Sequence, residues 1–175
     1  MEYNCTNEHY LDLRTKYPHL FNKIQNSGFF KEVSTYCPIF NDSTNGLSPL
    51  NVLQELKKLD ANSISALSAF EYLEGIFQPE ILIKSIQRVL SKNGLLFLTT
   101  RCVSGFDIQI LWQHSKSILP PQHVTLFSIE GMVSFLESNG FSIKELSTPG
   151  QLDLDIVSNE LEIIPKFQFQ ILYVI

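Results

Sequence analysis

Polar side chains able to do chemistry stand at three points of the sequence, each at the end of an apolar run or within a long loop. The three points are Phe70–Glu71, Thr99–Arg101 and Gln122–His123. The carboxyl ends of neighbouring parallel strands meet at one edge of a sheet, and ligands of open α/β sheets bind outside that edge. The sequence therefore predicts that these three points converge on a single ligand site.

Two of these residues have competing interpretations. Glu71 is either a carboxylate that contacts a ligand or an exposed anion at a turn before a helix. His123 is either a general base, because imidazole titrates near neutral pH, or a loop histidine that bonds the backbone beside Pro120–Pro121. The rigid proline pair favours the second interpretation, and His123 is still the best catalytic candidate in the chain. Glu74 is predicted to be either a surface charge or a charge in the first turn of a helix.

The remaining candidates also have an ordinary structural alternative. Thr99 and Thr100 line the site or are simply good strand residues. Arg101 binds an acidic group of a substrate or is a solvated charge at the end of a strand. Trp112, together with Phe106, covers a pocket or packs within the long loop. We expect Gln122, beside His123, to lie on the same side as Arg101 and Trp112, where a substrate would bind.

Hydrophobic spacing supplies the elements that hold these points. The predicted helices cover 48–59, 79–92 and 129–138, and the predicted strands cover 64–70, 95–100 and 141–146. Proline at the first position starts two of the helices, and Asn-Gly pairs end two of them. Residues 2–26 have helix-like spacing interrupted by Pro18, and 29–40 includes a possible strand. A helix that leads directly into a strand, in a unit that repeats along the chain, implies a parallel sheet.

We therefore predict an α/β fold, a mostly parallel, Rossmann-like sheet flanked by helices. The predicted division is an N-terminal helical region with a degenerate strand and loop at 1–47, and the α/β domain at 48–175. Too few residues precede Ile64 for three complete strand–helix units together with N-terminal helices. The sheet is accordingly expected to be incomplete in its N-terminal half.

Composition excludes several classes of protein. The chain has 175 residues and a net charge of -5, without a basic stripe, which argues against general nucleic-acid binding. It contains no apolar run of the roughly 20 residues that span a bilayer, and its polar N-terminus is unlike a signal peptide, so we predict a cytoplasmic protein that binds no membrane. The three cysteines are widely separated, and His9, His19 and His114 lack metal-ligand spacing, so no metal site is predicted.

Five phrases between residues 70 and 145 resemble the C-terminal half of class I S-adenosylmethionine-dependent methyltransferases. They stand in the order found in that family and cover about half of the chain. The family phrases are "FEVLEH", "LKPGG", "TTPN", "PPEHL..F" and "GF.v.e", and the corresponding segments here are Phe70–Gly75, Leu90–Gly94, Leu98–Cys102, Pro120–Phe127 and Gly140–Glu145. The resemblance implies a Rossmann-like fold, S-adenosylmethionine as cofactor and a small-molecule methyl acceptor. It places Phe70, Glu71, Thr99 and Thr100 on the cofactor side.

The chain also departs from the family pattern. Gly75 replaces a histidine, and Arg101 replaces a proline. No upstream segment matches the family's DxGxGxG loop, in which glycines let the backbone approach the cofactor. The only candidate recognised from the sequence is Tyr36–Gly46, which has one glycine.

These departures leave two hypotheses open for the function. One is a methyltransferase acting on a small molecule, which would need the missing motif from another segment of a longer protein or from another chain. The other is an inactive, truncated module that acts in dimerisation or protein interaction. In the second case a homodimer or a partner chain would cover the incomplete sheet.

Overall fold

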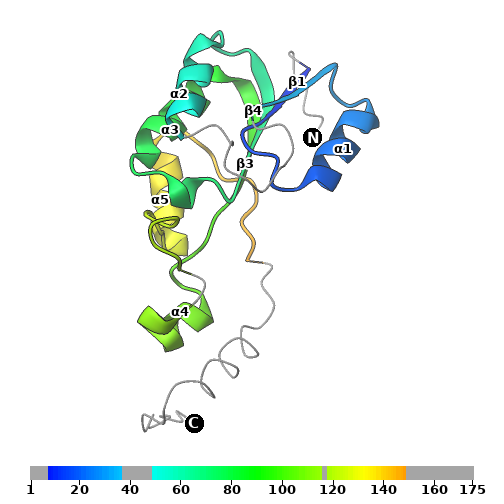
Figure 1. Ribbon diagram of the computed structural model, residues 1–175. Helices are drawn as coiled ribbons and strands as arrows, with labels where there is room; N and C mark the ends of the chain where they lie inside the picture. The colour runs from blue at the N-terminus through cyan, green and yellow to red at the C-terminus, as the bar shows by residue number, and fades with distance from the viewer. Residues whose placement is uncertain (1–7, 37–48, 116–117, 149–175) are drawn as a thin grey trace, which may run out of the picture.

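A computed structural model of the protein describes residues 8–36, 49–115 and 118–148 (Figure 1). Its centre is a 4-stranded sheet in the order β2-β1-β3-β4. The strands are β1 (His9–Asp12), β2 (Glu32–Thr35), β3 (Ile64–Phe70) and β4 (Leu90–Thr99). Every pairing is parallel. The predicted α/β class with a parallel sheet is thus confirmed.

Helices cover both faces of this sheet. The described helices are α1 (Pro18–Ser27), α2 (Pro49–Lys58), α3 (Pro79–Val89), α4 (Phe106–Leu111), which lies away from the sheet, and α5 (Ile129–Ser138), with short 3₁₀ turns η1 (Leu73–Gly75) and η2 (Trp112–His114). Figure 1 shows α2, α3 and α5 on one side of the strands and α1 on the other. The arrangement is a three-layer sandwich, in which each face of the sheet has its own apolar core.

Alternation along the strands separates the two cores. Tyr10 and Ala66 point to the α1 side, where they pack with Phe21 of α1. Leu11 and Leu67 point to the opposite side. The larger core there also takes buried side chains from three helices, namely Val52, Leu56, Leu82, Ile83, Ile86, Val89, Met132 and Leu136. A central strand buried on both faces is typical of parallel sheets.

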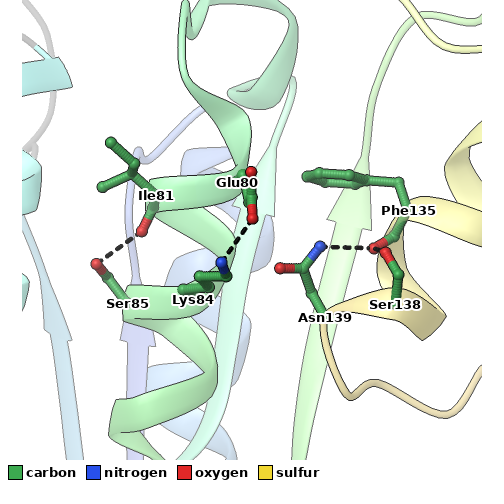
Figure 2. Close-up of polar contacts among 7 residues, drawn as sticks. All are labelled: Glu80, Ile81, Lys84, Ser85, Phe135, Ser138 and Asn139. Carbon is green, nitrogen blue, oxygen red and sulfur yellow. Dashed lines mark hydrogen bonds and ion pairs between the residues drawn. The ribbon is translucent and has the colours of Figure 1, made fainter.

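Helix α3 shows how the sequence separates core from surface. Pro79 stands at its first position, where the missing N–H costs nothing. Leu82 and Ile86 are buried, whereas Glu80 and Lys84 form an exposed ion pair at 2.5 Å one turn apart, shown in Figure 2. The same view shows the end of α5, where the Asn139 side chain donates to the carbonyl oxygen of Phe135 at 2.8 Å.

The N-terminal region differs from the sequence prediction. Residues 9–12 were expected to be helical and instead form β1, which pairs with both β2 and β3. The helix begins only at Pro18. A strand of 4 residues is too short for period-two alternation to stand out from helical spacing, so the prediction was wrong here. The division between residues 47 and 48 lies outside the described residues and stays a prediction, although strands from both sides of it share one sheet.

Two further predictions were wrong. Asn93–Gly94 does not end a helix but lies inside β4, where Asn93 has a φ of 68° and the pairing with β3 shifts register. A bulge of this kind needs a left-handed residue, which asparagine tolerates. Residues 141–146 form no strand in the described part of the chain. Phe141 and Ile143 pack as single side chains against the larger core instead.

Ser128 caps α5 as predicted, accepting a hydrogen bond from the Gly131 amide at 3.0 Å.

Candidate ligand site at the carboxyl edge of the sheet

The carboxyl edge, where β1, β3 and β4 end, begins with a buried polar chain. The Tyr10 hydroxyl donates to Ser68 Oγ at 2.6 Å, and Ser68 Oγ donates to Asp12 Oδ1 at 2.7 Å. Asp12 is 3% exposed. All three side chains share the α1 face, because Tyr10 and Asp12 alternate with Leu11 along β1. These hydrogen bonds hold a carboxyl group at the last residue of β1, an inner strand of the sheet.

Burial raises the pKa values of two of these side chains, Asp12 and Tyr10. Burial raises the pKa of Asp12 to about 6, although the hydrogen bonds from Ser68 and from the Arg14 amide oppose the change. Burial likewise raises the pKa of Tyr10 to about 12, with the Ser68 hydrogen bond opposing and the Asp12 charge adding to it. Desolvation disfavours the charged form of an acid, which is the common cause.

The loop 13–17 connects β1 to α1 along this edge. The amide of Leu13 donates to the Ser68 carbonyl at 2.9 Å, and Thr15 Oγ1 lies 2.9 Å from Thr35 Oγ1 of β2. No residue of 13–17 has a positive φ. The loop therefore follows a path that ordinary L residues adopt without strain. Two of its exposed members, Lys16 and Tyr17, extend toward the end of β3.

Glu71 is the centre of the contacts at this edge. Its φ of 46° is left-handed, which is uncommon outside glycine and costs roughly 1–3 kcal/mol. Its amide donates to the carbonyl and the hydroxyl oxygen of Thr99 at 2.9 and 3.1 Å. Its carboxylate accepts the Tyr17 hydroxyl at 2.5 Å and pairs with Lys16 Nζ at 3.1 Å. Both carboxylate oxygens are thus engaged by the loop that follows β1.

These contacts shift the pKa values of the Glu71 carboxyl group and the Tyr17 phenol. Burial by itself raises the pKa of Glu71, but the hydrogen bond from Tyr17 and the charge of Lys16, helped by Arg101, outweigh it and hold the pKa below its ordinary value. The hydrogen bond to Glu71 raises the pKa of the Tyr17 phenol, and burial and the charges of Glu71 and Glu74 add to this effect. The Glu71 side chain is thus a carboxylate near neutral pH.

Glu74 differs from its prediction as a surface charge. It is 3% exposed, and its Oε2 accepts the Thr100 hydroxyl at 3.1 Å. Its backbone carbonyl accepts the amides of Val124 and Thr125 at 2.8 and 3.0 Å. The contact with Thr100 and those with the loop come from residues far along the chain, which explains why local sequence pattern gave no sign of the burial.

The loop that carries Gln122 and His123 is held at this edge. Nδ1 of His123 accepts the Leu119 amide at 3.0 Å, beside the cis Pro120–Pro121 bond. The ring thus bonds the backbone of its own loop, as the structural interpretation expected. With Nδ1 as acceptor, a neutral ring carries its proton on Nε2. Gln122 is exposed, and its amide donates to the Leu119 carbonyl at 2.7 Å.

The structure brings several other candidates to the same edge. The Phe70 ring packs edge-on against Tyr17, with centroids 5.7 Å apart, and the charge of Arg101 reaches both Tyr17 and Glu71. Trp112 is different. It begins η2, is 71% exposed and stacks on no aromatic ring within the described ranges. Its part in a substrate site stays a prediction.

The described residues contain neither a metal-ligand cluster nor a membrane-spanning helix. In residues 8–36, 49–115 and 118–148, no three His, Cys, Asp or Glu side chains gather as metal ligands would. No helix in that described part is both long enough and apolar enough to cross a bilayer.

Comparison with known proteins agrees with the geometry. The model of a methyltransferase domain family matches residues 4–146, so the chain belongs to that family. No curated protein matches. Among solved structures, the chain resembles an S-adenosylmethionine-dependent methyltransferase from Archaeoglobus fulgidus, with a TM-score of 0.57 and 14% identity over 92% of this chain and 81% of that one. It also matches the 4+2 cyclase SpnF, with a TM-score of 0.46 and 18% identity over 79% of this chain and 52% of that one. At 14% identity, the likeness to the Archaeoglobus fulgidus structure shows the Rossmann-like fold alone.

Family membership identifies the segment that sequence reasoning missed. The family's glycine loop follows the first strand, and here that strand is β1, ending at Asp12. Counted from Asp12, the glycine positions of DxGxGxG hold Arg14, Lys16 and Pro18. The earlier candidate, Tyr36–Gly46, follows β2 and lies mostly outside the described residues. The missed signal was the phrase Tyr10–Leu13, an apolar run with an acid at the position where the family has one.

Whether the cofactor fits depends on side chains rather than on the backbone. The loop needs no left-handed residue, so the lost glycines cost no conformational strain. Lys16 and Tyr17 contact the two carboxylate oxygens of Glu71. However, Tyr17 is 42% exposed, and the Lys16 side chain is 39% exposed. Exposed ion pairs contribute about 0.2–1 kcal/mol. A ligand that contacts the Glu71 carboxylate would have to displace these two side chains.

Proposed function

We propose that the chain binds S-adenosylmethionine at the carboxyl edge and transfers its methyl group to a small-molecule acceptor. The observation that carries this proposal is Glu71, whose strained backbone presents an ionised carboxylate at the end of β3. Strained residues at strand ends concentrate at functional sites. Membership of the methyltransferase domain family supports the assignment of this edge to the cofactor.

In this proposal each residue has a role in positioning. Phe70, Glu71, Thr99 and Thr100 hold the cofactor, which when bound supplies a methyl group made electrophilic by its sulfonium. The contribution of the chain is to bring the acceptor into line with that methyl group. Arg101, Gln122 and Trp112 are assigned to the acceptor side.

His123 is the proposed catalytic residue, and its hydrogen bond refines that role. Because Nδ1 accepts the Leu119 amide, the neutral ring has a proton to donate from Nε2. We therefore assign His123 to orienting an acceptor oxygen through Nε2. Removing a proton with Nε2 would require the other tautomer and the loss of the Leu119 hydrogen bond. A cytoplasmic location, and a homodimer or partner covering the sheet, remain part of the proposal.

A second candidate function rests on the contacts of the loop after β1. Lys16 and Tyr17 take both oxygens of Glu71, as expected if the edge has become a structural contact in an inactive module. Such a module would act through dimerisation or binding to another protein. The two candidates predict opposite outcomes in a cofactor-binding experiment.

The test is calorimetric titration of the full chain with S-adenosylhomocysteine. We expect micromolar binding that weakens about 10- to 100-fold in Glu71→Ala, because a hydrogen bond to a charged group contributes about 1.5–3 kcal/mol. The matched control is Glu80→Ala, which removes an exposed carboxylate that also pairs with a lysine but has no contact with Glu71 (Figure 2). We expect the control to leave the affinity unchanged.

The double variant Lys16→Ala with Tyr17→Phe separates the two candidates. If the edge is a cofactor site, releasing Glu71 should raise the affinity about two- to fivefold, given the small energies of exposed pairs. If neither the natural chain nor this variant binds while both remain folded by circular dichroism, the enzyme proposal is wrong and the interaction module is favoured.

A further inference from the structure

The buried carboxyl group of Glu74 has no explanation in the proposed contacts with cofactor or acceptor. Glu74 lies in η1, between the end of β3 and the start of α3, and is 3% exposed. Burying a carboxylate costs several kcal/mol unless partners compensate. An apolar side chain of similar volume would fill the same space at no such cost. The presence of a carboxyl group here therefore calls for a function that its hydrogen bonds perform.

The side-chain and backbone hydrogen bonds of Glu74 connect three segments of the carboxyl edge. The side chain accepts the Thr100 hydroxyl at the end of β4. The backbone carbonyl accepts two amides of the loop that carries Gln122 and His123. Thr125 adds a further link between the same segments, because its hydroxyl donates to the Ile76 carbonyl at 2.7 Å. Glu74 is thus the residue through which the turn after β3 is joined to both β4 and this loop.

The Glu74 carboxylate is also within electrostatic reach of the site itself. Its charge is among the causes that raise the pKa of the Tyr17 phenol, which donates to Glu71.

We infer that Glu74 is a positioning residue, which fixes Thr100 and the loop 118–125 relative to Glu71 through its hydrogen bonds. This inference rests on the proposed function, because it assigns Glu74 to the same cofactor edge. It makes Glu74 neither a ligand contact nor a proton donor. Its contribution is to hold in place two groups that do contact ligands.

Two substitutions at one position separate geometry from charge. Glu74→Gln keeps the length of the side chain and an oxygen that can accept the Thr100 hydroxyl. Glu74→Leu fills the space but removes the acceptor. Thr100→Val removes the donor at the other end. For S-adenosylhomocysteine, we expect affinity within about twofold of the natural chain in Glu74→Gln and about tenfold weaker in Glu74→Leu and in Thr100→Val.

The double variant provides the decisive comparison. If Glu74 acts through Thr100, combining Glu74→Leu with Thr100→Val should weaken binding no more than about tenfold, because the two changes remove one interaction. A hundredfold loss, or an equal loss in Glu74→Gln and Glu74→Leu, would overturn the inference. A purely structural role would lower the melting temperature without this rescue by glutamine.

Amide hydrogen exchange tests the same inference without any ligand. The amides of Val124 and Thr125 donate to the backbone carbonyl of Glu74, which every substitution at this position keeps. We expect them to exchange about tenfold faster in Glu74→Leu, because loss of the side-chain hydrogen bond from Thr100 loosens the turn that carries this carbonyl. In Glu74→Gln they should exchange at the natural rate, and the α5 amides should be unchanged in both variants. If the natural chain binds no S-adenosylhomocysteine, the proposed function fails, and this exchange pattern alone decides the role of Glu74. Equal exchange in all three proteins would show that Glu74 positions nothing.

Discussion

Replacing Asp12 with asparagine should stabilise the protein at alkaline pH and have little effect at acid pH. Asp12 ends β1 with its side chain buried, hydrogen-bonded to Ser68 and to the Arg14 amide. Asparagine keeps an oxygen for those two donors and carries no charge. The comparison between the two proteins therefore isolates the cost of ionising one buried carboxyl group.

The magnitude follows from the pKa of about 6, raised from the ordinary 3.8. Between these values the folded state binds more protons than the unfolded state, so stability falls as pH rises. The contribution of Asp12 is complete below the unfolded pKa and is lost as pH rises through the folded pKa. About two pH units at 1.36 kcal/mol each give a loss of about 3 kcal/mol by pH 8. This is a large part of the usual stability of a domain.

The assay is urea unfolding followed by circular dichroism at pH values from 4 to 8. We expect Asp12→Asn to match the natural chain near pH 4 and to exceed its free energy of unfolding by about 3 kcal/mol at pH 8. Asp60→Asn, at an exposed position after α2, is the control and should show no such trend. A difference that does not change with pH, or an asparagine variant that is less stable throughout, would refute the reasoning.

Three further outcomes follow from single contacts. In spectrophotometric titration, the phenol assigned by Tyr17→Phe should ionise at lower pH in Glu71→Gln, because the carboxylate raises its pKa; an unmoved midpoint would contradict the hydrogen bond. Ile83→Ala, at a side chain 0% exposed, should lose about 2–5 kcal/mol in urea unfolding. Gly94→Ala should lose about 1–3 kcal/mol, because its Cβ would lie 2.9 Å from the Ser91 carbonyl oxygen.

Much of the architecture was readable from the sequence because it was encoded locally. Ile64–Phe70 is rich in small and apolar residues and forms β3, which is buried along almost its whole length. Pro79 marks the start of α3, and Ser128 caps α5. Each of these signals lies within the element that it specifies.

Features that depend on distant partners were missed. β1 is an inner strand of the sheet because it pairs with residues 32–35 and 66–68, and its local sequence does not show these pairings. The burial of Glu74 depends on Thr100 and Val124, which no local pattern links to it. The predicted convergence of Glu71 with Thr99 succeeded because it used the rule for strand ends and not the identity of either residue.

The contacts of Lys16 and Tyr17 with Glu71 have a consequence for how any ligand would bind. A ligand competes with groups tethered beside its own site, so its apparent affinity is its intrinsic affinity multiplied by the fraction of molecules in which Glu71 is released. The Lys16–Glu71 pair is partly exposed, and dissolved salt weakens such pairs. That fraction therefore grows with ionic strength, and a ligand of no net charge should bind this protein more tightly in concentrated salt than in dilute buffer.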